Sequence, residues 1–169
     1  MAKNPNEILL GPGVFYINEV PIGLTRGGSQ FVVEREFRPI AADGDKGKVK
    51  GRITKDTSTP KLTVNAMQII NANLPKMYAA IKSTNSDGAT KITGKEDVED
   101  SDYIDHVKWV GETKGGKGVR IKVFNAINLE NLDWSFVEKD ETIGTLTYEG
   151  CYEEDSEADY EPWEIEFDD

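Results

Sequence analysis

Short turns divide the sequence GVFYINEVPIGLTRGGSQFVVEREF, residues 13–37, into segments in which apolar and polar residues alternate. Such alternation is typical of a half-buried β-strand, because successive side chains point to opposite faces of a sheet. We expect strands over residues 13–18, 20–25 and 29–37, joined by turns at Asn18-Glu19 and at Arg26-Gly27-Gly28. This part of the sequence therefore predicts antiparallel β-structure.

Further segments extend this pattern along the chain. Alternating strands are expected over residues 61–69, 103–110, 118–127, 132–140 and 142–152. One helix is expected over residues 74–82, because Ile70, Leu74, Met77 and Ile81 have helical spacing and Pro75 suits a first helical turn. The predicted fold class is mainly β: an antiparallel β-sandwich or barrel-like domain over residues 1–169, with one flanking α-helix and an N-terminal arm at residues 1–12.

Two polar segments are candidates for function. Residues 41–60 are rich in Gly, Lys, Asp and Thr, and they predict a long exposed loop, a kind of segment that is usually functional. The C-terminal segment, residues 150–169, places aromatic residues among acids, and we interpret it as an arm that docks on a neighbour rather than as a solvated end. The candidate loop residues are Asp43, Gly44, Asp45, Lys46, Gly47, Lys48, Val49, Lys50 and Gly51. The candidate arm residues are Tyr160, Pro162, Trp163, Ile165 and Phe167.

The formal net charge of −11 is unevenly distributed along the sequence. Residues 138–169 contain 14 acidic residues and one lysine, which gives −13 and leaves +2 on the other residues. This balance argues against a protein that binds nucleic acid by neutralising phosphates, since such proteins cluster Lys and Arg. It also suggests a hypothesis, that lysines of residues 41–60 meet the acidic C-terminal segment of another copy.

A possible phosphate-binding loop is GETKGGKG, residues 111–118, which matches seven of the eight positions of G-x-x-x-x-G-K-[ST]. Gly118 has no hydroxyl for a magnesium ion, and the next residues, VRIKVFNAI, predict a strand instead of a helix. We therefore expect a hairpin loop here and no nucleotide site.

Other chemical sites have little support in the sequence. Cys151 and His106 are the only cysteine and histidine, which removes disulfides and Cys/His zinc sites. A nucleophile–base pair of these two residues is an alternative to a packed thiol and an edge-strand imidazole. The carboxylates of residues 92–102 lack the spacing of a calcium loop. We expect no enzyme, no cofactor and no metal, in a soluble protein without a membrane span or export signal.

The order of the motifs is more specific than any one of them. GPGVFYINEVPIGLTRGG is followed by a strand, the loop IAADGDKGKVKG, a second strand, LPKMYAAI and finally LTYEGCYEEDSEADYEPWEIEF. This order and spacing resemble the tail tube (major tail) proteins of long-tailed bacteriophages over nearly the whole chain. Two departures are Cys151, where a histidine is common in that family, and Glu19, which replaces the usual glycine of the first hairpin.

The resemblance implies a structural virion protein whose hexameric rings stack into a hollow tail tube that conducts phage DNA from capsid to host cell. The implied partners are other copies, the tail-tip, tape-measure and tail-terminator proteins, and double-stranded DNA that passes through the lumen without specific binding. Because an acidic or neutral lining repels phosphates and leaves DNA mobile, we also predict a net negative lumen. The implied location is the virion tail, assembled in the host bacterial cytoplasm, with no membrane binding by the subunit.

Two alternatives stay open. One is the inner tube of a contractile tail, a tailocin or a secretion-like machine. The other is a monomeric β-sandwich module that binds carbohydrate, with Trp109, Trp134 and Trp163 stacking on sugars.

Overall fold

The computed structural model describes residues 3–69 and 72–169 and shows a mainly β-protein, with 51% strand and 6% helix. This confirms the expected fold class. The strands in the described residues are β1 (Leu9–Ile17), β2 (Val20–Pro21), β3 (Thr25–Pro39), β4 (Ile53–Ala66), β5 (Ile81–Ser86), β6 (Ala89–Gly94), β7 (Ile104–Thr113), β8 (Gly118–Ile127), β9 (Gly144–Gly150) and β10 (Trp163–Phe167). The short helical segments are η1 (Pro5–Glu7), α1 (Leu74–Met77) and η2 (Asp100–Asp102).

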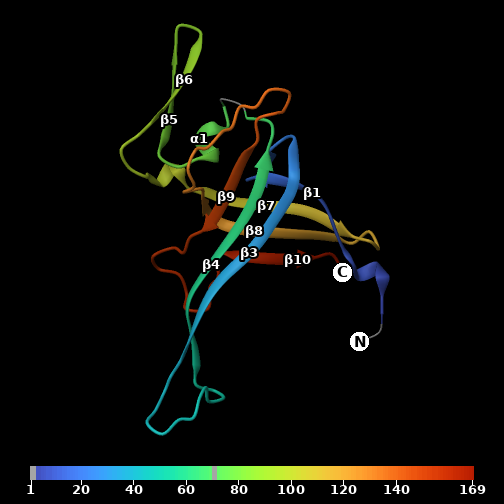
Figure 1. The fold of residues 1–169 in the computed structure, drawn as a ribbon, viewed down its shortest axis with the longest axis vertical. Coiled ribbons are helices and arrows are strands. Elements are labelled where there is room, and N and C mark those ends of the chain that lie inside the picture. Colours follow the sequence, from blue (N-terminus) through green and yellow to red (C-terminus); the bar gives the residue numbers. More distant parts are fainter. Residues whose placement is uncertain (1–2, 70–71) are drawn as a thin grey trace.

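The large sheet bends at β8. Its strand order is β2-β1-β7-β8-β9-β4-β3, and β10 also pairs with β8. Residues 119–123 of β8 pair with β10, whereas Ala126 and Ile127 pair with β9. β3, β4 and β9 consequently run along the long axis of the molecule, while β7, β8 and β10 run across it (Figure 1). Two sets of strands that cross in this way form an orthogonal β-sandwich.

The core lies between the two sets of strands. Leu62 and Val64 of β4 alternate with the outward-facing Lys61 and Thr63, as the period-2 pattern predicts. The Phe15 ring of β1 stacks on Tyr148 of β9, with 5.9 Å between the ring centroids. Other buried members of the core are Ile17, Ile22, Ala66, Val107, Trp109, Val119, Val123, Ala126 and Leu146.

Two glycines make room for a tryptophan in this core. Gly13 of β1 and Gly111 of β7 are partners in the strand register. A Cβ atom added to Gly13 or Gly111 would lie 2.3 Å or 2.1 Å, respectively, from the indole of Trp109. Gly111, which opens the segment that resembled a phosphate loop, is therefore a packing residue.

The helix predicted over residues 74–82 is wrong in extent, because α1 ends at Met77. Leu74 and Met77 are buried as the helical spacing suggested, and Ile70 lies outside the described residues. Tyr78, however, is extended and Ala80 has φ +55°. Hydrogen bonds from the Asn128 side chain and the Tyr148 hydroxyl to the carbonyls of Met77 and Lys76 hold this turn on the body. The chain then enters β5.

The strand predicted over residues 132–140 is also wrong, because this segment is irregular. Trp134 is half-buried and donates a hydrogen bond to the Tyr78 hydroxyl at 3.3 Å, but Leu132 and Phe136, which alternation would place on the same face, are exposed. The edges of β9 are occupied instead by β4 and β8. The other strands predicted for the larger sheet correspond to β1 to β4 and β7 to β9, although β2 is only two residues long.

Two long hairpins project from the body toward opposite ends of the long axis (Figure 1). One consists of β5 and β6, so Ile81 and Lys82 of the predicted helix begin a strand instead. The other consists of β3 and β4, whose pairing continues out to Pro39 and Ile53. The loop predicted over residues 41–60 is therefore shorter, because its second part belongs to β4. The turn expected at Arg26-Gly27-Gly28 is instead an irregularity within β3.

Candidate functional site

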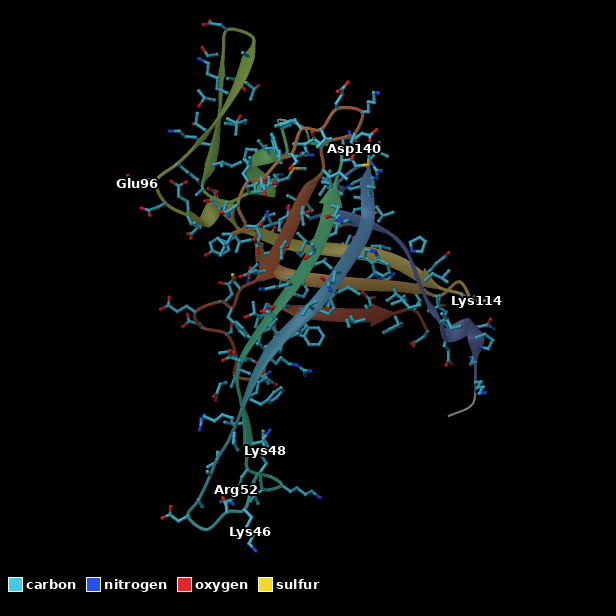
Figure 2. All side chains as sticks on the ribbon, in the orientation of Figure 1. Lys46, Lys48, Arg52, Glu96, Lys114 and Asp140 are labelled. Carbon is cyan, nitrogen blue, oxygen red and sulfur yellow. The ribbon has the colours of Figure 1, made fainter. Side chains whose placement is uncertain are left out.

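The predicted loop residues Asp43 to Gly51 lie at the tip of the β3–β4 hairpin, residues 40–52. Every residue of the tip is exposed except Arg52, which is half-buried. The tip stands far from the sandwich core, with Lys46, Lys48 and Arg52 at the lower end of the molecule in Figure 2. The tip is therefore exposed to contact by another molecule.

An ion pair inside the tip gives it a defined shape. The Arg52 guanidinium lies 2.6 Å from the Asp45 carboxylate, which also accepts a hydrogen bond of 2.8 Å from the Ala42 amide. Gly44 and Gly51 have φ +88° and +83°, a backbone conformation that glycine adopts without strain. Lys46, Lys48 and Lys50 form no ion pair with the described residues, so their charges remain available to a partner.

An apolar strip adjoins the lysines, and the sequence analysis missed it. Phe37 and Pro39 continue the strand face that carries Phe31, and Ile53 is the register partner of Pro39. Phe37 is 56% exposed and Ile53 is 52% exposed. The core-facing side of the sheet thus extends past the end of the core without being covered. The sequence does contain a signal for such a strip. Apolar residues flank the polar loop on both sides, at positions that pair when the flanking strands form a hairpin.

The outer edge of β3 is a second feature suited to assembly. β3 is 15 residues long and pairs with β4 on one side only, within the described part of the chain. An unpaired edge presents a row of backbone donors and acceptors that can add another strand. β3 carries Glu34 and Glu36, and charges of this kind protect a free edge from indiscriminate pairing.

The predicted C-terminal arm is bound to its own chain. Residues Trp163–Phe167 form β10, which pairs antiparallel with β8. Pro162 is buried, and Trp163 packs on Phe31 with 5.8 Å between the ring centroids. Tyr160 meets Tyr152 edge to face at 6.3 Å. Ile165 and Phe167 remain exposed, so a contact of these two side chains with a neighbour stays a prediction.

Basic residues of the same chain neutralise the carboxylates of β10 and its flanks. Arg120 binds both Glu166 and Asp168, and Lys122 lies 2.8 Å from Glu164. Hydrogen bonds to Arg120 lower the pKa of Glu166 and of Asp168, and the hydrogen bond to Glu164 raises the pKa of Lys122. These acids are consequently less available to lysines of another copy than their number in the sequence suggests.

The acids of residues 153–159 behave differently from those of β10. None of Glu153, Glu154, Asp155, Glu157 and Asp159 forms an ion pair in the described structure. The C-terminal acidic segment is therefore divided into a neutralised strand and an open turn.

The weaker chemical candidates gain no support from the geometry. Residues 114–117 form the turn between β7 and β8, which confirms the expected hairpin. The His106 ring lies 3.0 Å from the Glu19 carboxylate, and burial raises the pKa of the Cys151 thiol, which makes it a poorer nucleophile. Lys95 bridges Glu99 and Asp102 in the segment considered for calcium.

The described residues offer neither a metal-binding cluster nor a membrane-spanning helix. Among residues 3–69 and 72–169, no group of three or more His, Cys, Asp or Glu side chains is arranged to hold a metal ion. In the same residues, no helix combines the length and the apolar character that crossing a membrane requires.

Comparison with known proteins does not place the chain in a family. No protein-family model matches the sequence, and no curated protein matches it either. The β-sandwich fold and the exposed surfaces of the hairpins are therefore the basis for a functional proposal.

Proposed function

We propose that the protein is a self-assembling structural subunit whose hexameric rings stack into a hollow tube of the phage tail type. The observation that carries this proposal is the β3–β4 hairpin, which projects from the body with exposed Phe37 and Ile53 beside unpaired lysines. An isolated two-stranded hairpin is at best marginally stable in water, so a neighbour that covers it would stabilise it. The order of sequence motifs supplies the tail tube as the particular assembly.

The free edge of β3 supports ring formation in this proposal. Pairing of this edge with a strand of a neighbour would continue the sheet from one subunit to the next. A heterologous contact of this kind closes into a ring when the rotation between subunits matches a whole number of copies. The partners of the subunit would then be other copies first, followed by tail-tip, tape-measure and tail-terminator proteins.

The outer face of β3, β4 and β9 is suited to line a channel for DNA. It carries Glu34, Glu36 and Glu149, with Lys61 lying 3.1 Å from Glu34 and 3.3 Å from Glu149. The Thr63 and Thr147 hydroxyls are hydrogen-bonded across this face at 3.2 Å. A polar surface with more acids than bases does not hold phosphates, because it offers them no counterion release. We therefore place this face toward the lumen.

The carbohydrate-binding alternative has less support. Trp109 is buried, while Trp134 and Trp163 are half-buried and pack on their own chain. Sugar binding requires exposed aromatic faces, which these three residues do not provide. The inner tube of a contractile tail uses the same kind of assembly, and a sheath protein encoded beside this one would distinguish it.

Electron microscopy of the purified protein, dilute and concentrated, together with its mass in solution, tests the proposal. We expect rings, and tubes of uniform width at high concentration. Subunits that stay monomeric at every concentration, and also after addition of a tail-tip complex as initiator, would contradict it.

A further inference from the structure

An apolar groove lies at the end of the body opposite the β3–β4 tip. Its lining residues are Leu24, Met67, Gln68, Ile69, Trp134, Phe136, Glu141 and Thr142, and its volume is about 520 Å³. One wall comes from the residues just before the start of β3 and just after the end of β4. The other wall comes from the irregular residues 129–143. The groove is therefore built by two segments that the sandwich core holds in place.

The walls of this groove are unusually exposed for apolar side chains. Phe136 is 80% exposed, Leu24 is 68% exposed and the adjacent Val137 is 64% exposed. Single exposed apolar residues are common, but a cluster with a groove and a polar rim marks an interaction site. The strand prediction for residues 132–140 failed at this surface, because apolar residues alternate in the sequence there but no described strand pairs with them.

The charges of the groove and of the tip are opposite in sign. Residues 129–143 contain five acids, Glu130, Asp133, Glu138, Asp140 and Glu141, against the single base Lys139. The tip, residues 40–52, contains four bases and two acids. Arg26 lies 3.2 Å from Asp140 and 2.9 Å from Glu141, which fixes these two carboxylates at the rim and offsets one negative charge. A net attraction between tip and rim remains.

The tip lies at one end of the molecule and the groove at the far end of the body, as Lys46 and Asp140 show in Figure 2, although the β5–β6 hairpin extends further in the same direction. A single subunit cannot bring them together. Two copies placed end to end along the long axis can, and each added copy leaves the same pair of surfaces free again. Such a head-to-tail contact generates an open, repeating stack.

We propose that the β3–β4 tip of one copy docks in this groove of the next copy along the long axis. Ile40 and Val49 occupy the groove against Phe136, while Lys46, Lys48 and Lys50 face the acidic rim. The exposed areas of Ile40 (51%) and Val49 (38%) are then buried together with the groove walls. This inference rests on the proposed function and specifies the contact by which one ring meets the next.

Cross-linking of the full chain tests this contact. In a Cys151→Ala background, the double variant Val49→Cys/Phe136→Cys is concentrated and oxidised, and the products are separated by mass. A head-to-tail contact predicts a ladder of dimers, trimers and longer products, because every copy carries one cysteine in the tip and one in the groove. Each single variant can give at most dimers. We expect the yield of trimers and longer products to exceed that of a control pair about tenfold, because docking raises the effective concentration of the two thiols.

The control pair is Val49→Cys/Thr90→Cys, which places the second thiol on the exposed β5–β6 hairpin. A ladder from Val49→Cys/Ser156→Cys in place of the groove pair would locate the tip on the acidic turn and overturn the inference. Equal yields from the groove pair and the control pair would overturn it too.

Charge exchange provides a second readout that does not depend on thiols. Lys46→Glu/Lys48→Glu/Lys50→Glu should shorten stacks while isolated rings keep their mass, and adding Glu138→Lys/Asp140→Lys/Glu141→Lys should restore the length in part. Rings and tubes of normal length in the first variant would overturn the docking contact and leave the proposed function standing. A wild-type protein without rings would overturn the proposed function itself.

Discussion

β10 and the β3–β4 tip were both expected to be assembly arms, and the structure treats them in opposite ways. β10 is paired in register with β8, and its carboxylates are bound to Arg120 and Lys122 of the same chain. Lys46, Lys48 and Lys50 of the tip have no such partners among the described residues, and these lysines and the apolar residues of the tip face solvent. The difference shows that a charged segment is available to a neighbour only where its own chain leaves it unsatisfied.

The largest expected effect is on the free energy of unfolding, and it should differ between a variant in the body and a variant in the β3–β4 hairpin. Leu62 is 1% exposed, so Leu62→Ala should lower the free energy of unfolding by about 2–5 kcal/mol through lost burial and a cavity. Phe37→Ala, at 56% exposure, should change it by about 0.5 kcal/mol or less. Urea unfolding of the dilute subunit measures both. Similar losses in the two variants would mean that the hairpin is covered in the isolated subunit.

The next largest expected effect on stability comes from a glycine in the body, and it tests how tightly Trp109 is packed. Gly111→Ala would force Trp109 from its place and should cost about 1–3 kcal/mol through overpacking. Gly11→Ala is a matched control, because its added Cβ meets nothing within 4 Å. Urea unfolding compares the two. An unchanged midpoint in Gly111→Ala would show that the indole has room to move.

Most of the body could be predicted from the sequence, because its strands bury alternate residues. β8 was expected over the residues that form it, and the Asn18-Glu19 turn joins β1 and β2 with Asn18 at φ +53°. Periodicity describes only the burial of side chains, however. It could not reveal that residues 132–140 lack a pairing edge, or that Ile81 starts a strand instead of ending a helix.

The candidate surfaces were predictable only in part. The composition of residues 41–60 identified an exposed basic segment, and the structure places its lysines at a hairpin tip. Net charge could not distinguish acids bound to Arg120 from acids left open at residues 153–159, because that depends on which strands pair. The groove at Phe136 joins segments more than a hundred residues apart in sequence, and no local pattern contains that information.

Acid should loosen β10 by removing the charges that bind it to Arg120. The pKa values of Glu166 and Asp168 are lowered from 4.5 and 3.8 by hydrogen bonds to Arg120. A lowered folded-state pKa means stabilisation that is present above the ordinary value and is lost as the pH falls through the lowered value. We expect protection factors of the β10 amides, measured by hydrogen exchange, to fall below about pH 4. Arg120→Met should reduce these protection factors already at pH 7. Equal protection of the wild-type amides at pH 7 and pH 3 would show that the ion pairs with Arg120 do not hold β10 in place.

The smallest expected effect on stability belongs to the tip itself. Lys46, Lys48 and Lys50 form no ion pair with the described residues, so Lys46→Glu/Lys48→Glu/Lys50→Glu should change the unfolding free energy of the dilute subunit by about 0.5 kcal/mol or less. The same variant should assemble poorly, because repulsion replaces attraction at the acidic surface of the next copy. Urea unfolding and electron microscopy of one preparation separate the two effects. Lys91→Glu, on the β5–β6 hairpin, is the matched control and should alter neither. A large loss of stability in the triple variant would show that the tip already has a partner within its own chain, and the contrast with β10 would disappear.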